Sequence, residues 1–412
     1  MQINRSKIEN LINELCPNGV EFKCLWQVTF WDKRFNGVSQ EKQEETLSFK
    51  HVSAKHLKEI GVENGEVKLL STGQFNGWTT KDLAGINLNH GEVITIPSGG
   101  SANIKYYKGD FVDSGNILAS SADDKIINLK YCYYYLLIKN DFISSCFRGS
   151  GVKHPDMVKI LSIKIPVPPL AIQEEIVKIL DNFTELEAEL EAELEARKKQ
   201  YEYYRDQLLT FRNVEYNNLE NIFNFKNGYT PSKAKSQYWE DGDIPWFRME
   251  DIRGNGRILD KSIQHVNKSG VKVKGVFPKN SIIVATSATI GEHALITIPH
   301  LTNQRFVSLS IKEELKQKFN IKFLFYYFFI LDEWCLKNTS KSSFASVNMT
   351  GFRKFPIPMP PINEQERIVS ILDKFDALVN DISIGLPAEL KARRRQYEYY
   401  RNKLLTFKEY DK

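Results

Sequence analysis

The chain has 412 residues, 42% of them apolar and 26% charged, with a formal net charge of +5 at pH 7. This length allows two or more domains, each of which buries a core of its own. No stretch approaches the roughly 18 consecutive apolar residues of a membrane span, and the N-terminus lacks the apolar segment of a secretory signal. We therefore expect no membrane partner.

The five cysteines are scattered along the chain and form no C-x-x-C pair. An odd, scattered set of thiols is typical of a reducing compartment, and it supports neither a disulfide framework nor a zinc site. We therefore predict a cytoplasmic protein with free cysteines.

Residues 1–165 are predicted to form a first α+β domain, which begins with a short N-terminal helix. Short β-like runs alternate with glycine-rich turns across residues 91–120. An aromatic run follows at 131–138, and we expect it to form a short helix near the end of the domain.

Residues 166–211 are predicted to form one long helix behind an extended start. Pro166, Pro168 and Pro169 exclude a helix before them. After the prolines, apolar residues recur at intervals of three and four, which is the period of one helical face. A helix from about 172 to 210 would be about 58 Å long at ~1.5 Å per residue. A helix of this length with one apolar stripe requires a partner.

A four-residue unit repeats inside this helix. Leu-Glu-Ala-Glu begins at Leu186, repeats at Leu190 and begins again at Leu194. Each unit adds close to one turn, so the apolar stripe shifts by only about 40° while the helix lengthens by ~6 Å. B-DNA rises about 3.4 Å per base pair, so one unit spans slightly less than two base pairs. We interpret the repeat as an adjustable ruler; a plain coiled-coil segment with an accidental repeat is the alternative.

Residues 212–357 are predicted to form a second α+β domain. It opens at 227–257 with a run that mixes lysine, arginine, glycine and aromatic residues. The segment 279–296 parallels 90–104 of the first domain. The dense aromatic run 323–334 is too short to span a membrane and favours a buried helix.

Residues 358–412 repeat the helical segment, again behind three prolines. This copy contains Gly385 and Pro387, which we expect to break or kink the helix, and Pro387 is well placed to restart it. The sequence leaves the continuity of the helix across this point open.

The chain is a tandem duplication. Residues 165–183 match 357–375 at an offset of 192, and residues 197–211 match 393–407 at an offset of 196. We predict an α+β fold with two globular domains separated by two long helices, which pack as an antiparallel coiled coil with pseudo-twofold symmetry. The alternative is that each helix packs only on its own domain.

Charge is distributed in blocks. The net charge is +2 over 1–165, −6 over 166–211, +8 over 212–357 and +1 over 358–412. Two positive blocks separated by an acidic segment indicate two polyanion-binding lobes on a spacer that does not itself bind. Uneven surface charge without a function is the alternative.

Sequence motifs of catalysis are absent. The chain has no phosphate-binding G-x-x-x-x-G-K-[ST] loop, no H-E-x-x-H, and no Asn/Asp-Pro-Pro-Tyr/Phe sequence of a DNA amino-methyltransferase. His51 and His56 lack a third ligand, so we expect surface or core residues there. Asp123-Asp124-Lys125 lacks the upstream acid of a nuclease. We predict no catalytic residue and no metal site.

Several glycine-rich loops suit contact with nucleic acid. They mix basic, amide, hydroxyl and aromatic residues, and such side chains bind phosphates or read base edges. Ordinary solvated loops are the alternative for each loop by itself. In the first domain the predicted DNA-binding residues are Trp78, Thr79, Lys81, Ser98, Arg148 and Lys153. In the second domain they are Tyr229, Thr230, Lys233, Arg248, Thr286, Ser287, Arg305, Lys341 and Asn348.

The apolar stripes of the two helical segments are the predicted spacer and subunit-docking surface. In the first segment they comprise Leu186, Leu190, Leu194, Tyr201 and Tyr204. In the second they comprise Leu378, Ile382, Leu390, Tyr397 and Tyr400.

Four features together resemble one known family. They are the proline-led helix starts at 166–183 and 358–375, both Gln-Tyr-Glu-Tyr-Tyr-Arg helix ends, the opening of the second domain, and the central Leu-Glu-Ala-Glu units. On these features the chain resembles, over essentially its whole length, the specificity subunit of a type I restriction–modification enzyme. The first domain lacks the opening pattern of the second, so the resemblance supports its loops less directly.

The resemblance implies a non-catalytic DNA-recognition subunit. Each target-recognition domain is expected to read one half of a bipartite double-stranded DNA target, and the helices to set the gap and dock two modification subunits. S-adenosylmethionine is expected in those adenine-methylating subunits, and ATP and Mg in restriction subunits, with no cofactor in this chain. A stand-alone coiled-coil DNA-binding scaffold or a self-contained nuclease is the competing hypothesis.

Overall fold

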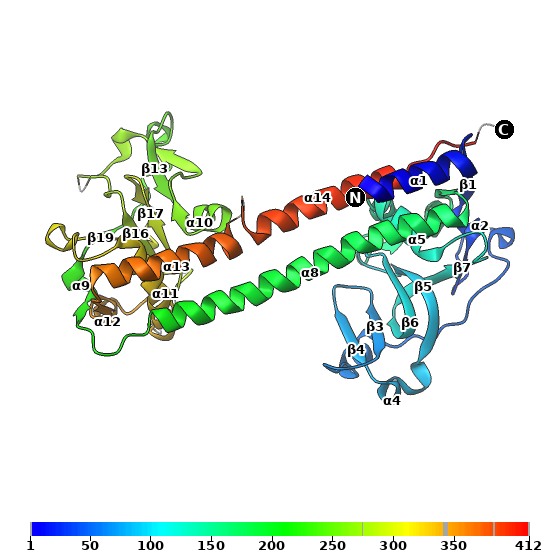
Figure 1. Cartoon of the computed structure of the whole chain (residues 1–412), viewed down its shortest axis with the longest axis horizontal. Coiled ribbons are helices and arrows are strands. Elements are labelled where there is room, and N and C mark those ends of the chain that lie inside the picture. Colours follow the sequence, from blue (N-terminus) through cyan, green and yellow to red (C-terminus); the bar gives the residue numbers. More distant parts are fainter. Residues whose placement is uncertain (1, 274, 341–344, 382–383, 411–412) are drawn as a thin grey trace. The chain divides into compact units, whose positions relative to one another are not determined.

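The chain folds into two units of mixed helix and strand. The computed structural model describes residues 2–273, 275–340, 345–381 and 384–410 (Figure 1). Unit 1 comprises Met1–Ala188 and Ala392–Lys412, and unit 2 comprises Glu189–Lys391. The predicted α+β class and the two-domain layout are therefore present.

Unit 1 is built around a curved set of six strands. Their order is β2-β7-β5-β6-β3-β4, and only β3 and β6 run parallel. The strands of the unit are β1 (Glu21–Cys24), β2 (Thr29–Trp31), β3 (Val67–Ser71), β4 (Asn76–Thr79), β5 (Asn89–Pro97), β6 (Lys105–Ser114), β7 (Asn116–Ser121), β8 (Phe147–Arg148), β9 (His154–Pro155) and β10 (Lys164–Val167). The helices are α1 (Gln2–Leu15), α2 (Leu25–Val28), η1 (Gln40–Lys42), α3 (Ala54–Glu59), α4 (Lys81–Ala84), η2 (Gly85–Asn87), α5 (Leu129–Ile138), α6 (Asn140–Ser145) and α7 (Met157–Leu161).

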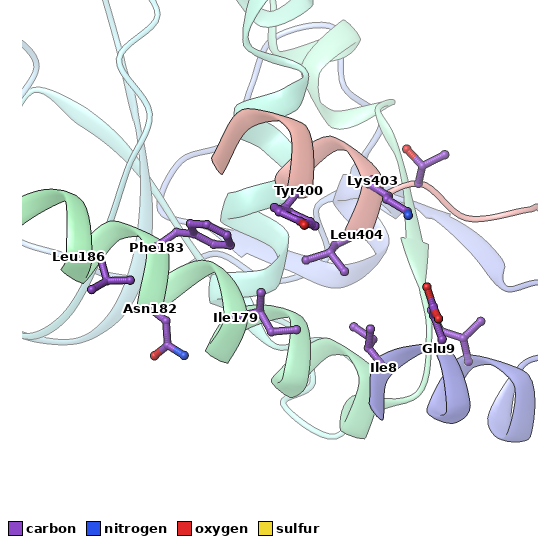
Figure 2. A pocket seen from close by; sticks show the side chains of 11 residues that line it. Ile8, Glu9, Ile179, Asn182, Phe183, Leu186, Tyr400, Lys403 and Leu404 are labelled. Carbon is purple, nitrogen blue, oxygen red and sulfur yellow. The ribbon is translucent and has the colours of Figure 1, made fainter. Parts of the chain in front are cut away.

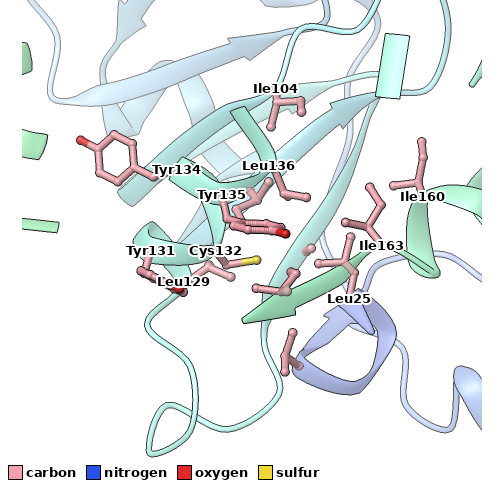
Figure 3. Packing of buried hydrophobic residues seen from close by; sticks show 14 of the residues in the cluster. Leu25, Ile104, Leu129, Tyr131, Cys132, Tyr134, Tyr135, Leu136, Ile160 and Ile163 are labelled. Atoms are coloured by element: carbon pink, nitrogen blue, oxygen red, sulfur yellow. The ribbon is translucent and has the colours of Figure 1, made fainter. Parts of the chain in front are cut away.

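The expected aromatic helix of unit 1 is α5, and it lies in the core (Figure 3). Asn128 caps its first turn by accepting a hydrogen bond from the N–H of Tyr131 at 3.1 Å, as a short polar side chain does at this position. Tyr131, Cys132 and Leu136 are fully buried. A helix that is apolar all round requires such burial.

Unit 2 contains two main sheets and a two-stranded sheet of β11 and β20. The larger main sheet has the order β12-β19-β16-β17-β14, and the smaller has the order β15-β13-β18. The strands are β11 (Tyr216–Asn218), β12 (Phe223–Asn227), β13 (Ile244–Phe247), β14 (Ile258–Leu259), β15 (Gln264–Val266), β16 (Ser281–Ala285), β17 (His293–Ile296), β18 (Leu301–Thr302), β19 (Phe306–Ile311) and β20 (Pro356–Pro358). The helices are α9 (Leu219–Ile222), η3 (Ser236–Tyr238), α10 (Met249–Asn255), η4 (Lys268–Gly270), η5 (Glu313–Leu315), α11 (Ile321–Lys337), α12 (Met349–Arg353) and α13 (Ile362–Asn380).

The buried helix predicted at 323–334 is α11. Asn320 caps it, and Phe323, Phe325 and Phe328 are almost completely buried in the main core of unit 2. The smaller sheet has a core of its own around Trp246, which is 3% exposed.

The first long helix is continuous and the second is interrupted. Helix α8 (Leu170–Leu208) agrees with the expected span within two residues; residues 170–188 belong to unit 1 and residues 189–208 to unit 2. The second copy consists of α13 and α14 (Leu386–Leu404). A side chain at Gly385 would collide with the carbonyl oxygens of Ala377 and Leu378, so only glycine fits at this interruption.

The two units repeat one set of hydrogen bonds at an offset of 192 residues. In unit 1 the side-chain oxygen of Gln173 accepts from the N–H of Asn128 at 2.8 Å, and in unit 2 Gln365 accepts from the N–H of Asn320 at 2.8 Å. Each glutamine is fully buried and also donates to a proline carbonyl. Buried polar groups require such partners, and the repetition shows the tandem duplication in the fold.

A second repeated contact joins the aromatic helix of each unit to a long helix. Asp181 of α8 accepts from Lys130 at 2.7 Å and Tyr134 at 2.5 Å. Asp373 of α13 accepts in the same way from Lys322 at 2.7 Å and from the hydroxyl of Tyr326 at 2.6 Å. The long helices are therefore anchored to the two domains by the same charge-assisted hydrogen bonds.

Candidate nucleic-acid interface

Two loops of unit 1 come together and carry three of the predicted DNA-binding residues. The N–H of Gly100, after β5, donates to the carbonyl of Lys153 at 2.8 Å, and the ring of His154 bonds the carbonyl of Ser98 at 2.7 Å. Arg148 pairs with His154 across the short β8–β9 hairpin. Arg148 and Lys153 are exposed and basic, so this surface suits phosphate contact.

The remaining predicted residues of unit 1 lie on the β3–β4 hairpin and at the start of α4. Trp78 is 39% exposed, and the ammonium of Lys68 lies 4.2 Å from its ring centre. Lys81 is exposed and forms an ion pair with Asp110 at 2.9 Å. Thr79 is fully buried, and its hydroxyl donates to the carbonyl of Ile60 at 2.6 Å; its side chain supports the hairpin and has no surface to offer DNA.

In unit 2, four predicted residues gather where loops from three strands meet. The N–H of Thr286 donates to the carbonyl of Arg305 at 3.0 Å. Thr230 donates to the side chain of Gln304, the neighbour of Arg305, at 2.5 Å. Ser287 forms an isolated antiparallel β-bridge with Ser346. Arg305 is exposed at the centre of this group.

Other predicted residues of unit 2 have structural contacts. Tyr229 is 9% exposed, and its hydroxyl accepts from the N–H of Lys272 at 2.9 Å. Arg248 precedes α10, and its guanidinium lies 5.6 Å from the ring centre of Trp246. Lys233 is exposed on the loop after β12. Lys341 lies outside the residues that the structure describes.

Asn348 is the cap of helix α12. Its side-chain oxygen accepts from the N–H groups of Thr350 and Gly351 at 3.2 and 3.3 Å. At an offset of 192, Asp156 caps α7 in unit 1. This matching position in the two repeats was a signal, available in the sequence, that Asn348 has a structural role.

Three polar residues of unit 1 that are not among the predicted DNA-binding residues lie beside these loops. Gln74 is exposed at the tip of the β3–β4 turn, and Asn103 and Lys105 bind the backbone of that turn. The amide and lysine side chains in these loops were a weak signal by themselves, because their partners lie about 30 residues away in the chain.

Electrostatics differ between two histidines, His51 of unit 1 and His300 of unit 2. In unit 1, His51 lies 2.8 Å from Asp113 and 3.0 Å from Asp32. Hydrogen bonding to these carboxylates raises the pKa of His51 to about 9. In unit 2, burial lowers the pKa of His300 to about 4. Over the ranges that the structure describes, no group of three histidine, cysteine or acidic side chains is arranged to hold a metal ion.

The predicted spacer residues pack inside each unit. In unit 1 the ring of Phe183 lies 6.3 Å from that of Tyr397 and 5.6 Å from that of Tyr400. In unit 2, Phe375 makes the equivalent contacts, at 6.4 Å to Tyr201 and 5.6 Å to Tyr204. Matching ring pairs thus join the long helices in both repeats.

The other spacer residues range from exposed to half-buried. Leu186, Tyr204 and Leu378 are 41%, 42% and 38% exposed. Leu190, Leu194 and Leu390 are half-buried, and Ile382 lies outside the described residues. Leu186 and Tyr400 line a partly open cavity of about 260 Å³ in unit 1, which lies between α1, α8 and α14 (Figure 2).

The fold defines a class of protein: a tandemly duplicated α+β protein with exposed basic side chains on the loops of each unit. The family described as "Type I restriction modification DNA specificity domain" matches residues 51–196 and 212–392. The chain therefore belongs to this family, whose description names a DNA specificity domain.

Individual relatives agree with the family. The chain is 56% identical to the specificity subunit of the type I restriction enzyme EcoprrI of Escherichia coli, over 50% of this chain and 53% of that subunit. It is 38% identical to the EcoR124I/EcoR124II specificity subunit of Escherichia coli, over 70% of this chain and 74% of the relative. The match to the first relative spans about half of that relative's length.

Solved structures have the same fold. The S subunit of the type I restriction–modification system of M. genitalium has a TM-score of 0.58 and 16% identity, covering 94% of this chain and 96% of that one. A chain of another type I system, solved for its complex assembly and conformational transition, has a TM-score of 0.59 and 14% identity, covering 95% and 98%. Among the helices of the described residues, none is long and apolar enough to cross a bilayer.

Proposed function

We propose that the chain is the non-catalytic specificity subunit of a type I restriction–modification complex, in which each unit reads one half of a bipartite DNA target. The observation that carries this proposal is the repetition itself. One framework occurs twice, and each copy presents its own exposed basic loop surface: Arg148 and Lys153 in unit 1 and Arg305 in unit 2. Two different readers on one framework suit a target with two different halves.

The proposed target-recognition domains are 1–165 and 212–357, and the proposed spacers are 166–211 and 358–412. The spacers pack as an antiparallel coiled coil. In unit 1, support comes from the order of the contacts: Phe183 meets Tyr400 and Tyr397, and further along α8, Glu187 bonds Arg394 at 2.6 Å. The residue numbers of the partners decrease as those of α8 increase, so the two helices run in opposite directions there.

The Leu-Glu-Ala-Glu units set the gap between the two half-sites. Helix α8 is continuous across these four-residue repeats, and this supports the proposal because each repeat of a regular helix is ~6 Å long. The half-buried Leu190 and Leu194 keep the stripe on one face of α8.

Two modification subunits dock on the helical segments, and restriction subunits join the complex in the cytoplasm. The apolar cavity beside Leu186 and Tyr400 supports docking, because exposed apolar surfaces of this kind mark interaction sites. S-adenosylmethionine, ATP and Mg belong to those partners, and the target adenine is flipped out for methylation there.

Methylome sequencing tests the proposal. Cells that express the chain with its modification subunits should show one bipartite motif with methyladenine in both halves, and this pattern should disappear when the gene is deleted. Scattered methylation that is unchanged by the deletion would refute the proposal.

The purified chain tests the competing hypothesis. DNA cleavage with metal and without partners would indicate a nuclease, and absence of DNA affinity would indicate a scaffold. The relatives support neither of these, since they are named as specificity subunits.

A further inference from the structure

The β3–β4 turn of unit 1 is held by side chains from another part of the chain. The ammonium of Lys105, at the start of β6, donates to the carbonyls of Ser71 at 2.6 Å and Gly73 at 2.8 Å. The side-chain amide of Asn103 donates to the carbonyls of Thr72 at 3.2 Å and Gly73 at 2.9 Å. Three consecutive carbonyls of the turn are therefore occupied from one side.

Lys105 is unsuited to contact DNA phosphates. Its ammonium is half-buried and points at neutral carbonyls of its own chain, and burial lowers its pKa. Removing a charge from water is unfavourable unless its hydrogen bonds are satisfied. These hydrogen bonds instead hold the backbone of the turn in place.

The same loop connects the turn to the basic surface of unit 1. Asn103 lies in the β5–β6 loop, whose Gly100 bonds to Lys153 and whose Ser98 bonds to His154. Ser98 is itself fixed, because its hydroxyl donates to the carbonyl of Gly115 at 2.5 Å. The β3–β4 turn, the β5–β6 loop and the β8–β9 hairpin thus form one connected surface.

Gln74 is the exposed side chain at the tip of this held turn. It lies between Gly73, whose carbonyl accepts from both Lys105 and Asn103, and Phe75, whose carbonyl accepts from the hydroxyl of Ser71 at 2.9 Å. Both of its neighbours are therefore fixed. A glutamine amide can donate to and accept from one adenine edge at the same time, and this readout requires a defined backbone position.

We propose that Gln74 reads a base edge in the half-site of unit 1, and that Lys105 and Asn103 are positioning residues that hold its turn for this contact. The inference rests on the proposed function and deepens it. It assigns to Lys105 an effect on base preference. A lysine in a basic lobe would ordinarily be expected to bind phosphate, whatever the DNA sequence.

The test uses the assembled complex of the full chain with its modification subunits. Methylation motifs are determined for the wild type and for Q74A, K105M, N103L and the control K108M. Lys108 lies on the same strand as Lys105, but its side chain is 70% exposed and forms an ion pair with Glu92 at 2.9 Å. K108M is expected to leave both half-sites unchanged.

Q74A is expected to relax one position in one half-site, with about a tenfold to hundredfold loss of discrimination there, the usual worth of a bidentate base contact. K105M and N103L should relax the same position, while the other half-site stays as in the wild type. A phosphate-binding role for Lys105 would instead lower methylation of all targets evenly and reduce the salt dependence of DNA binding, and that result would overturn the inference.

The outcomes separate this inference from the proposed function. A wild-type complex without a bipartite motif refutes the proposed function. A wild-type bipartite motif that Q74A leaves unchanged in both halves overturns the inference alone. Q74A is decisive if K105M fails to fold, because Gln74 is exposed and its loss removes no buried contact.

Discussion

Units 1 and 2 share a framework but differ where one helix covers it. In unit 1, α1 packs on α8: Ile8 is 2% exposed within the core, Ile172 is fully buried, and Lys7 bonds Glu175 at 2.5 Å. In unit 2, Glu364 is equivalent to Ile172 and Arg367 is equivalent to Glu175. Arg367 donates two hydrogen bonds to Glu364, at 2.7 and 2.8 Å.

The difference shows how a duplicated surface adapts to its cover. Beneath α1, where water is excluded, unit 1 has an apolar residue and a buried acid. At the more exposed equivalent positions, unit 2 has an acid and a base that form an ion pair. Gln173 and Gln365 lie next to these positions and are unchanged, because they bond to backbone groups inside each repeat. The two repeats therefore have the same residue where its side chain bonds to buried backbone groups. They have different residues where the position is covered in unit 1 and more exposed in unit 2.

The largest expected effect concerns the spacer and leaves both readers alone. Deleting Leu190–Glu193 should shorten the target gap by slightly less than two base pairs, because one turn of helix is lost. Methylome sequencing should recover both original half-sites at the new gap. Altered half-site sequences would show that α8 does not act as a spacer.

Equivalent phenylalanines should respond unequally. Phe183 is 7% exposed, and F183A should lower the free energy of unfolding by about 3 kcal/mol. Phe375 is half-buried, so F375A should cost about half as much. Chemical denaturation measures the loss, and hydrogen exchange assigns it to one unit. Equal losses would contradict the difference in burial between the two rings.

The two units should lose stability at opposite ends of the pH scale. The pKa of His51 in the folded state is about 9, above its ordinary 6.5, so its stabilisation of about 2 kcal/mol is full below pH 6.5 and is lost as pH rises through 9. The pKa of His300 is about 4, so unit 2 loses a similar amount as pH falls from 6.5 to 4.

Unfolding at a series of pH values measures both effects. H51Q should remove the loss on the alkaline side and leave the acidic side unchanged. A wild-type profile that is flat between pH 6.5 and 9 would show that the carboxylates do not hold a proton on His51.

The smallest effects are expected at two ion pairs that differ in burial. K7M leaves the nearly buried Glu175 without its partner and should cost about 1 kcal/mol, while R367M, at an exposed pair, should cost less than about 0.5 kcal/mol. Thermal unfolding of both variants provides the comparison. A larger cost for R367M would contradict the difference in burial between the two faces.

Regular periodic elements were predictable from the sequence, and most site contacts were not. The prolines before residue 170 and the apolar period of 166–211 predicted α8. Gly385 and Pro387 indicated a break or a kink, and the structure shows that α13 and α14 are separate helices there. Loop composition led to Arg148, Lys153 and Arg305, which are exposed, but also to Thr79 and Asn348. The hydroxyl of Thr79 is buried against Ile60, and Asn348 caps a helix.

The sequence by itself determined the duplication, the long helices and a break or kink at Gly385 and Pro387, because repeat offsets, helical periodicity and proline or glycine backbone limits act over neighbouring residues. The tertiary structure decided which loops form one surface and which polar side chains are used up inside it. Lys105 reaches the carbonyl of Ser71 across 34 positions of the chain, and only the packed strands bring these two groups within 2.6 Å.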